Sequence, residues 1–423
     1  MKQTVPVVGV DVSKRISDMC VLAPNNEIMA RLKIYHDLTS MERSVAELRR
    51  VENECGVAPV IVMESTSHYH LILFQFFCEA GYEVIVVNPI QSGALKNINV
   101  RKVKNDKVDA YKIAMLYRLK VLRKSQVPVD SLRGLRLLCR QRAELMNDVT
   151  SYKNRLAAYL DQIFPSYDKV FSDVGGAASR AVLRECPTPQ ILLLKSENEL
   201  LRIICIAGYK GHTFGVKKVE KLRHVAEDAL RLGLYAPGNA AVVISAVAML
   251  DALLNGIWEI EQAIKALIIQ ELFIQKNIAL LQTIPGIGPH SSIALLAEIG
   301  DFTLFQKPKQ LVAYFGLDPS QRQSGMFTDS KMKLSKRGSS YVRALLHLAA
   351  VSSVAPHQNQ SPANPVLFAY YQEKCKTKPP RIVMCALMHK LCNIIFAVLR
   401  DQKPFEWRQP EQHATRLGLV SVA

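Results

Sequence analysis

The order of its apolar runs is the feature that most limits how the N-terminal part of this chain can fold. Three short β-branched runs separated by turn residues come first, which is typical of a meander of antiparallel strands. A segment with helical periodicity follows, and then two further strands flank a second helix. The strand runs are residues 5–12, 18–23, 28–35, 59–66 and 82–89. Three strands followed by alternating helix and strand is the ribonuclease-H arrangement, so we expect an α/β domain of that fold.

The rest of the chain is expected to be mainly helical. Residues 130–163 have the pattern of one long, charged amphipathic helix that Pro165 closes, and residues 238–275 that of a second long helix able to pair with it as a coiled coil. From residue 281 a helix, a turn with two glycines and another helix favour a helix-hairpin-helix element. We therefore expect an α/β domain, a helical linker and dimerisation region, a mainly α C-terminal domain and a tail, over residues 1–128, 129–275, 276–400 and 401–423.

Charge indicates the class of partner. Lys and Arg number 54 against 37 Asp and Glu, and this net charge of +17 favours a polyanion such as nucleic acid. The nine cysteines include no pair with zinc-knuckle spacing, so we interpret them as reduced core thiols in a cytosolic protein. Since the chain enters an apolar strand at once, and no uncharged stretch is expected to approach the roughly 18 residues that a membrane span needs, neither export nor membrane insertion is expected.

Four acids stand at positions that this fold would bring together. Asp11 lies within the first strand, Glu64 closes the fourth, and Asp106 and Asp109 share one face at the start of a helix. The first and fourth strands of a ribonuclease-H sheet are neighbours, so the four carboxylates can converge. Crowded carboxylates repel one another unless hard divalent cations neutralise them, which favours Mg²⁺, with Mn²⁺ as the alternative. Glu64 at a solvated strand end and the two helix acids as simple N-terminal caps remain the alternative interpretation.

Two segments have the composition of phosphate-binding surfaces. Residues 96–124 contain ten Lys and Arg against two acids, with Lys102, Lys104 and Lys107 nearest the acid pair. Gly286 and Gly288 would let backbone amides approach a phosphate at a helix N-terminus. A solvated helix face and an ordinary helix–helix turn are the respective alternatives.

A loop near the C-terminal end of the chain contains a serine among basic residues. Ser324 precedes Gly325, and taken alone such a serine is a turn residue. Neighbouring cations suited to phosphate are Arg322, Lys333, Lys336, Arg337 and Arg343.

Several motifs in the same order identify a family resemblance. They are GVDVSK, MESTSHYH, KNDKVDAYKIA, IPGIGPHSSIALLAEIGD and GLDPSQRQSG followed by SKRGSSYVRALLHLAA. With these the chain closely resembles the transposases of the insertion sequence 110 family over nearly its whole length. The resemblance implies a RuvC-like DEDD domain, whose acids match Asp11, Glu64, Asp106 and Asp109, and a C-terminal transposase domain whose nucleophilic serine matches Ser324. It also implies a prokaryotic enzyme of the cytoplasm and nucleoid, guided by a bridge RNA that pairs with donor and target DNA.

The expected reaction is strand breakage and rejoining through a phosphoserine link. Because two DNA duplexes must be held together, we expect a dimer or tetramer. No His or Glu close to Ser324 in sequence can act as its base, so we hypothesise that metals of the DEDD domain, from the same or another subunit, meet this serine. Ser335, Ser339 and Ser340 are rival serines that are better explained as helix caps, and Tyr341 as a backbone contact.

Two other functions fit the sequence. A metal-dependent nuclease of the Holliday-junction resolvase kind would use water as nucleophile, with Ser324 only contacting phosphate. A non-catalytic nucleic-acid-binding protein would use the acids as helix caps and the basic face to bind RNA.

Overall fold

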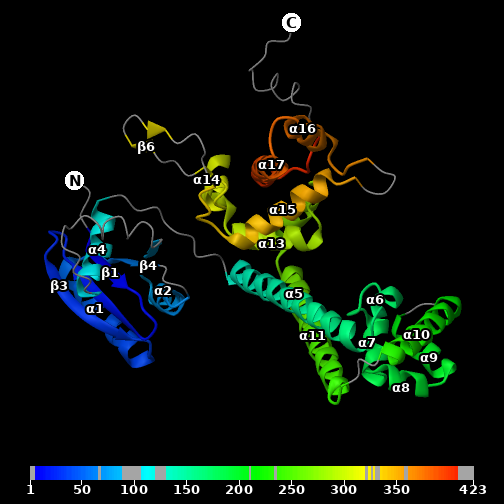
Figure 1. Ribbon diagram of the computed structural model, residues 1–423. Helices are drawn as coiled ribbons and strands as arrows, with labels where there is room; N and C mark the ends of the chain where they lie inside the picture. Colours follow the sequence, from blue (N-terminus) through cyan, green and yellow to red (C-terminus); the bar gives the residue numbers. More distant parts are fainter. Residues whose placement is uncertain are drawn as a thin grey trace, which may run out of the picture. The chain divides into compact units, whose positions relative to one another are not determined.

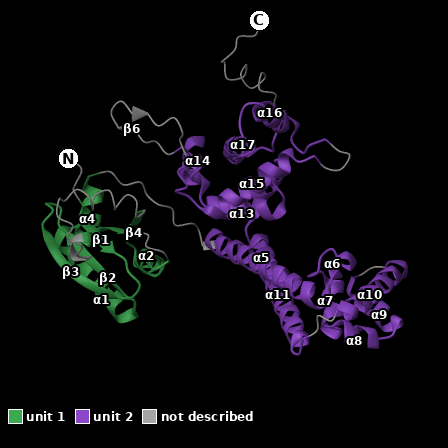
Figure 2. Ribbon diagram, in the orientation of Figure 1, with its two compact units in different colours: residues 1–127 green, residues 128–423 purple. Residues whose placement is uncertain are grey.

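The computed structural model forms two compact units, residues 1–127 and 128–423 (Figures 1 and 2). The residues that it describes are 5–64, 68–87, 106–119, 130–208, 211–232, 236–319, 323–324, 327–328, 334–356 and 361–407. The three-part division after residue 128 that the sequence predicts stays a prediction.

Unit 1 contains one mixed sheet of five strands in the order β3-β2-β1-β4-β5. The first three strands form an antiparallel meander, whereas β4 runs parallel to β1 and β5 parallel to β4. Their bounds are β1 (Val7–Asp11), β2 (Ile16–Leu22), β3 (Ile28–Tyr35), β4 (Val60–Glu64) and β5 (Val84–Val87). This order confirms the predicted ribonuclease-H-like arrangement.

Alternation along the strands divides unit 1 into two cores. One face, which includes Val8 and Val10, packs against α1 (Leu38–Cys55) and α2 (His70–Glu79). The opposite face, which includes Val7 and Val62, packs against α4 (Asp106–Arg118). Because successive side chains of a strand point to opposite faces, every second residue of β1 faces α4.

Gly9 sets how closely α4 approaches the sheet. A Cβ at this position would lie 2.0 Å from the carbonyl oxygen of Ala110 and 2.6 Å from the amide nitrogen of Ala114. Both atoms belong to the backbone of α4 and cannot move aside as a flexible side chain would. The helix therefore rests directly on β1, and only glycine allows this approach.

Unit 2 is helical apart from a two-stranded hairpin and one isolated bridge, in the part of it that the structure describes. Its helices are α5 (Asp130–Ile163), α6 (Tyr167–Val170), α7 (Ala177–Glu185), α8 (Pro189–Leu194), α9 (Glu197–Gly208), α10 (His212–Leu232), α11 (Asn239–Gln270), α12 (Leu272–Gln282), α13 (Pro289–Ile299), α14 (Pro308–Tyr314), α15 (Ser340–Val354), α16 (Pro365–Cys375) and α17 (Pro380–Asp401). The first long helix has the predicted bounds. The second ends earlier than predicted, because the backbone of Glu271 is extended (φ −126°, ψ 98°) and separates α11 from α12.

The two long helices, α5 and α11, pack along each other in antiparallel directions (Figure 1). Ser131 Oγ donates to Glu271 Oε1 at 2.7 Å, and further along α5 the Arg142 guanidinium contacts Glu261 at 2.8 Å. The distal halves of the pair, which are the C-terminal half of α5 and the N-terminal half of α11, share a core with α6 to α10. The proximal halves, which are the start of α5 and the end of α11, share a second core with α12 to α17. The predicted pairing of the two long helices is confirmed.

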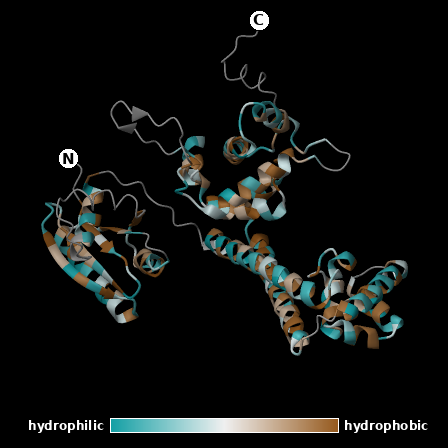
Figure 3. Cartoon of the chain, viewed as in Figure 1, coloured by the Kyte–Doolittle hydropathy of each residue, from teal (hydrophilic) through white to brown (hydrophobic). Residues whose placement is uncertain are grey.

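Two helices have the length and apolar composition of a membrane span, contrary to the expectation of none. They are α11 and α17, and Figure 3 shows hydrophobic residues along much of α11. Residues 232–250 in fact contain no Asp, Glu, Lys or Arg. Both helices pack within unit 2, and core helices of proteins that cross no membrane have the same composition.

All nine cysteines are free thiols, as predicted, although not all of them are in a core. Cys20, Cys139, Cys186 and Cys392 are buried, whereas Cys78 is exposed. Burial raises the pKa of the Cys139 thiol to about 12, which leaves it protonated and unreactive at neutral pH.

Replacement of Gly9 by alanine tests the close contact between α4 and β1. We expect Gly9→Ala to lower the free energy of unfolding of unit 1 by about 3 kcal/mol or more, because the new methyl group overlaps two backbone atoms. Gly56→Ala is the control: its left-handed backbone (φ 68°) disfavours alanine, but no atom lies within 4 Å of the new Cβ. We expect a loss of only about 1 kcal/mol there. Equal losses in urea denaturation would contradict the steric explanation.

Candidate active site

Strand register places two of the predicted acids side by side. Asp11 is the last residue of β1 and Glu64 the last of β4. The parallel pairing runs as far as Val10 with Met63, so these two acids follow at the same edge of the sheet. Asp11 is half-buried and Glu64 is 8% exposed. Since Asp11 lies two residues beyond Gly9, its side chain is on the face that α4 covers.

Helix α4 supplies the third acid. Asp109 directly precedes Ala110, whose carbonyl approaches Gly9, and it is only 6% exposed. Its carboxylate lies 3.5 Å from Lys112 Nζ one turn further along the helix. The contact at Gly9 thus brings Asp109 toward the edge where Asp11 and Glu64 end.

A fifth acid, Asp18, was missed by sequence reasoning. It pairs with Asp11 across the antiparallel strands β1 and β2, so both side chains point to the same face. On its other side Asp18 pairs with Lys33 of β3. The signal in the sequence was the acid near the start of the second apolar run, at the position where a hairpin returns to Asp11.

The donor set matches hard divalent cations in its chemistry. Asp11, Glu64 and Asp109 offer only carboxylate oxygens, the ligands that Mg²⁺ and Mn²⁺ prefer. Among the side chains that the structure describes, no three of His, Cys, Asp and Glu lie close enough together to hold an ion. Asp106 begins α4, and its side chain lies outside the described residues.

Ser324 lies on a short hairpin of unit 2. Strand β6 (Gln323–Ser324) pairs antiparallel with β7 (Phe327–Thr328), and Ser324 stands opposite Phe327. Ser324 is thus at the end of the ladder next to the turn. Its side chain lies outside the described residues.

The base of the loop that carries this hairpin is closed by two glycines. A Cβ on Gly316 would lie 2.7 Å from the amide nitrogens of Arg337 and Gly338, and one on Gly338 would lie 2.1 Å from the Tyr314 carbonyl oxygen. Pro319 and Leu334 form a bridge just above, and Ser335 Oγ donates to Asp318. The chain therefore leaves and re-enters the helical body at one fixed point.

Two of the three rival serines have structural partners. Ser339 caps α15 by accepting the Val342 amide at 3.3 Å, as predicted. Ser335 was wrongly predicted as a helix cap, because its hydroxyl donates to Asp318 within the loop base. Tyr341 donates from its hydroxyl to the Cys139 carbonyl at 3.2 Å, so this hydroxyl is bonded within the protein, and its predicted contact with a nucleic-acid backbone stays a prediction. Burial also raises the Tyr341 pKa to about 12, which disfavours the phenolate that a nucleophile needs.

The predicted nucleic-acid contacts fall into three groups. Lys336 and Arg337 are exposed beside the loop base, as a phosphate contact requires. Arg343 instead donates to the carbonyls of Phe315 (3.2 Å) and Gly338 (2.6 Å), so it holds the loop base together. The side chains that lie outside the described residues are those of Lys102, Lys104, Lys107, Arg322 and Lys333.

The two glycines of the turn before α13 have different surroundings. Gly286 has a φ of 98°, and its Cβ would lie 2.1 Å from Ser353 Oγ and 2.6 Å from the Ala349 carbonyl. Packing against α15 therefore accounts for Gly286 without a ligand. Gly288 begins α13, and no atom lies within 4 Å of the position of a Cβ there. Only Gly288 leaves the approach to the helix N-terminus open.

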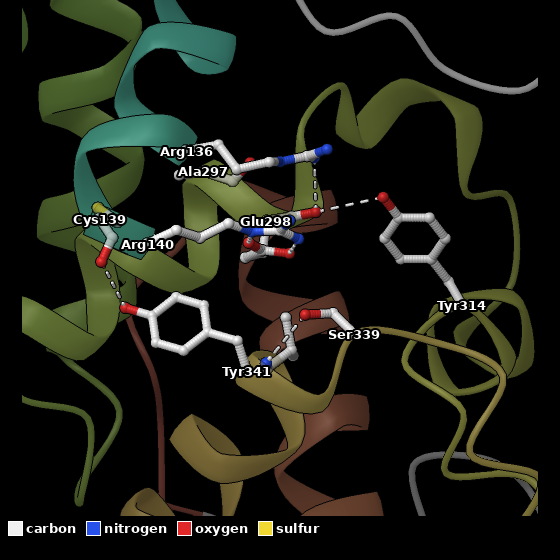
Figure 4. Close-up of polar contacts among 9 residues, drawn as sticks. Arg136, Cys139, Arg140, Ala297, Glu298, Tyr314, Ser339 and Tyr341 are labelled. Atoms are coloured by element: carbon white, nitrogen blue, oxygen red, sulfur yellow. Dashed lines mark hydrogen bonds and ion pairs between the residues drawn. The ribbon is translucent and has the colours of Figure 1, made fainter. Parts of the chain in front are cut away.

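An ion pair with a buried carboxylate joins α5 to α13 beside this region (Figure 4). Glu298 is 3% exposed and accepts two hydrogen bonds from the Arg140 guanidinium, at 2.6 and 3.0 Å. Arg136, one turn earlier, donates to the carbonyls of Ala297 and Glu298. Sequence reasoning missed this cluster, although a glutamate inside the apolar run ALLAEIG was a signal.

Comparison with known protein families gives two matches. Residues 8–165 match a family model of the IS110 DEDD kind described as "Transposase", and residues 278–366 match the model described as "Transposase IS116/IS110/IS902 family". The first match includes all four predicted acids, and the second includes Ser324.

Similar proteins are bacterial. The "Pilin gene-inverting protein" of Moraxella bovis is 36% identical over 130 residues, which is 31% of this chain. The chain aligns with only 39% of the length of that relative. The "Insertion element IS110 uncharacterized 43.6 kDa protein" of Streptomyces coelicolor is 23% identical over 78% of this chain and 79% of its own length. An IS116 protein of Streptomyces clavuligerus is 22% identical over 94% of this chain and 95% of its own length.

The Arg140–Glu298 pair can be tested by a double-mutant cycle. Arg140→Met leaves a buried carboxylate without its cation, and we expect it to lower the free energy of unfolding of unit 2 by about 2–3 kcal/mol, somewhat less than for a fully buried pair. The side chain of Arg140 is 48% exposed, which is why the loss is smaller. The double variant Arg140→Met with Glu298→Met is expected to recover part of this loss. Additive losses in chemical denaturation would show that the two side chains do not interact.

Proposed function

Because this chain belongs to the IS116/IS110/IS902 family of transposases, we propose that it breaks and rejoins DNA strands to move an insertion element. The observation that carries the proposal is the combination of an acid-bearing sheet edge in unit 1 with a serine-bearing hairpin on a closed base in unit 2. The name of the Moraxella relative, a gene-inverting protein, describes a reaction of the same kind. A protein that only binds nucleic acid would need neither feature.

We infer that Asp11, Glu64, Asp106 and Asp109 hold Mg²⁺, with Mn²⁺ as a substitute. When bound, such an ion neutralises and polarises the phosphate that is attacked. The carboxylates hold the ion through oxygen only, and the contact of α4 with β1 fixes Asp109 relative to Asp11. Lys112 beside Asp109 lowers the repulsion among the acids.

Ser324 is the proposed nucleophile. Its hydroxyl oxygen attacks the scissile phosphorus, the bond from phosphorus to the deoxyribose oxygen breaks, and that oxygen leaves with a proton as a free hydroxyl. A hydroxyl of the partner strand then attacks the phosphoserine and restores the serine, so one phosphodiester is exchanged for another without ATP. The loop base at Gly316 and Gly338 limits where Ser324 can be placed. We propose that the acids of unit 1, from the same or another subunit, meet it there.

The proposed partners are donor and target DNA, a bridge RNA and further copies of the chain, in the bacterial cytoplasm. Lys336, Arg337 and the open N-terminus of α13 at Gly288 are suited to phosphate, which is the role of a helix-hairpin-helix element. Large apolar side chains remain exposed on the α5–α11 pair, and these support a dimer or tetramer through the long helices. They are Leu137 (65%), Trp258 (62%) and Ile269 (73%).

The experiment that tests this function measures a covalent protein–DNA adduct. Purified protein is incubated with Mg²⁺, the RNA that flanks its element and labelled donor and target DNA. We expect an adduct from the unmodified chain and none from Ser324→Ala, because the alanine has no oxygen to bond to phosphorus. Asp11→Asn and omission of Mg²⁺ are expected to lower adduct formation at least a hundredfold.

Tyr341→Phe is the matched control for the nucleophile. This substitution removes the tyrosine hydroxyl and its hydrogen bond to the Cys139 carbonyl, which is worth about 1 kcal/mol of stability. We expect the variant to form the adduct at an unchanged rate. Cleavage that persists in Ser324→Ala without any adduct would favour water as nucleophile and thus the resolvase-like reaction. An adduct lost in Tyr341→Phe and kept in Ser324→Ala would assign the nucleophile to the tyrosine.

A further inference from the structure

The C-terminal helices line an open cavity that the proposed chemistry at Ser324 and the acids does not use. It has a volume of about 440 Å³, within the range of roughly 300–1,000 Å³ that is typical of small-ligand sites. Its walls come from the start of α16, the second half of α17 and the extended segment 403–407 that follows. Leu367 and Val398 on its wall are 5% and 6% exposed, so part of the lining is fixed in the core.

Two aromatic side chains flank this cavity. Phe405 and Trp407 pack edge to face, with ring centroids 5.2 Å apart and planes at 79°. The two rings are not stacked on each other, and Trp407 is 52% exposed. A flat, exposed indole beside an apolar cavity is suited to stacking with another flat ring.

The segment that carries the aromatic pair is held in place. Gln402 Nε2 donates to Asn277 Oδ1 at 2.9 Å, and the Phe405 amide donates to Thr283 Oγ1 at 2.8 Å. Asn277 lies in the middle of α12 and Thr283 directly follows this helix, so both acceptors belong to a separate part of the chain. The aromatic wall is therefore built before any ligand binds.

The polar groups of the cavity indicate what kind of ring it takes. Asn393 brings an amide donor and acceptor, and Lys390 and Lys403 bring positive charge. Lys390 lies 4.4 Å from the centre of the Tyr370 ring. Two acids also line the cavity, Asp401 and Glu406, and Asp401 is neutralised by a two-point ion pair with Arg400 at 2.7 and 3.0 Å.

We propose that this cavity binds one unpaired nucleobase of a single-stranded DNA or RNA segment. The base would stack on Trp407, Asn393 would contact its polar edge, and the two lysines would meet the flanking phosphates. A purely apolar partner such as a protein helix would leave the amide and the lysines without a role. The proposal rests on the proposed function for its nucleic-acid partner, but it assigns a binding site separate from Ser324 and from the acids.

The chain has two tryptophans, Trp258 and Trp407, which makes a direct optical test possible. In Trp258→Phe, Trp407 is the sole indole reporter. We expect its fluorescence to be quenched on titration with a ten-nucleotide oligothymidine or oligouridine, and not with a DNA duplex or with a strand of abasic sugar phosphates. The affinities for oligothymidine and oligouridine are compared to show whether single-stranded DNA or RNA is preferred.

Binding is then compared between two variants by fluorescence anisotropy of the labelled oligonucleotides. We expect Trp407→Ala to weaken single-strand binding about tenfold, the loss of one stacking contact. Trp258→Phe, which keeps a large apolar side chain at this exposed site on α11, is expected to leave binding unchanged. Asn393→Ala is expected to reduce the difference in affinity between bases more than the affinity itself.

Three results would overturn the proposal. Quenching by the abasic strand as strong as by oligothymidine would show that only phosphate is bound. Unchanged affinity in Trp407→Ala would show that the base lies elsewhere. A change of oligomeric state in Trp407→Ala, measured by sedimentation without any change in oligonucleotide binding, would assign the cavity to a second copy of the chain. Normal Ser324 adduct formation in any of these cases would leave the proposed function standing.

Discussion

The contact between the α4 backbone and β1 at Gly9 is the constraint on which the proposed metal site depends. A ribonuclease-H-like sheet by itself places Asp11 beside Glu64, because β1 and β4 are parallel neighbours. The third acid comes from a helix, and its distance from the sheet depends on the side chains between them. With glycine on the strand and alanines on the helix, the two backbones come into close contact, and Asp109 directly precedes this contact on the helix.

Close contacts that only glycine allows also occur in unit 2. Gly316 and Gly338 bring two backbone segments together under the Ser324 hairpin, and Gly286 brings the turn before α13 against α15. Charged groups also fix helices within unit 2. Arg140 and Arg136 hold α5 against the end of α13, and this links the long helical pair to the part of unit 2 that carries Ser324. The segments that carry the proposed site residues are thereby held at fixed bases.

Sequence patterns predicted the strand order and most long helices, because alternation and helical periodicity are local properties. They also found Asp11, Glu64 and Ser339 at the positions where the structure has them. What they missed depends on partners distant in the chain. The role of Glu298 depends on its ion pair with Arg140 of α5, which sequence patterns do not show. The segment with Phe405 and Trp407 was predicted only as a tail, because its hydrogen bonds to Asn277 and Thr283 join distant parts of the chain. For Gly286 the sequence could not show the packing against α15, which by itself requires a glycine at this turn.

The antiparallel pairing of α5 and α11 has a consequence for the order of folding. The core formed by α6 to α10 and the distal halves of the long helices is continuous in sequence, from Val149 to Ile257. The other core includes Leu132 and Cys139 together with residues as late as Leu399. During synthesis the first core can close while the start of α5 still lacks most of its neighbours. The first turns of α5 thus gain their partner α13 only after this first core can close, and the serine-bearing body, whose core extends to Leu399, is completed last.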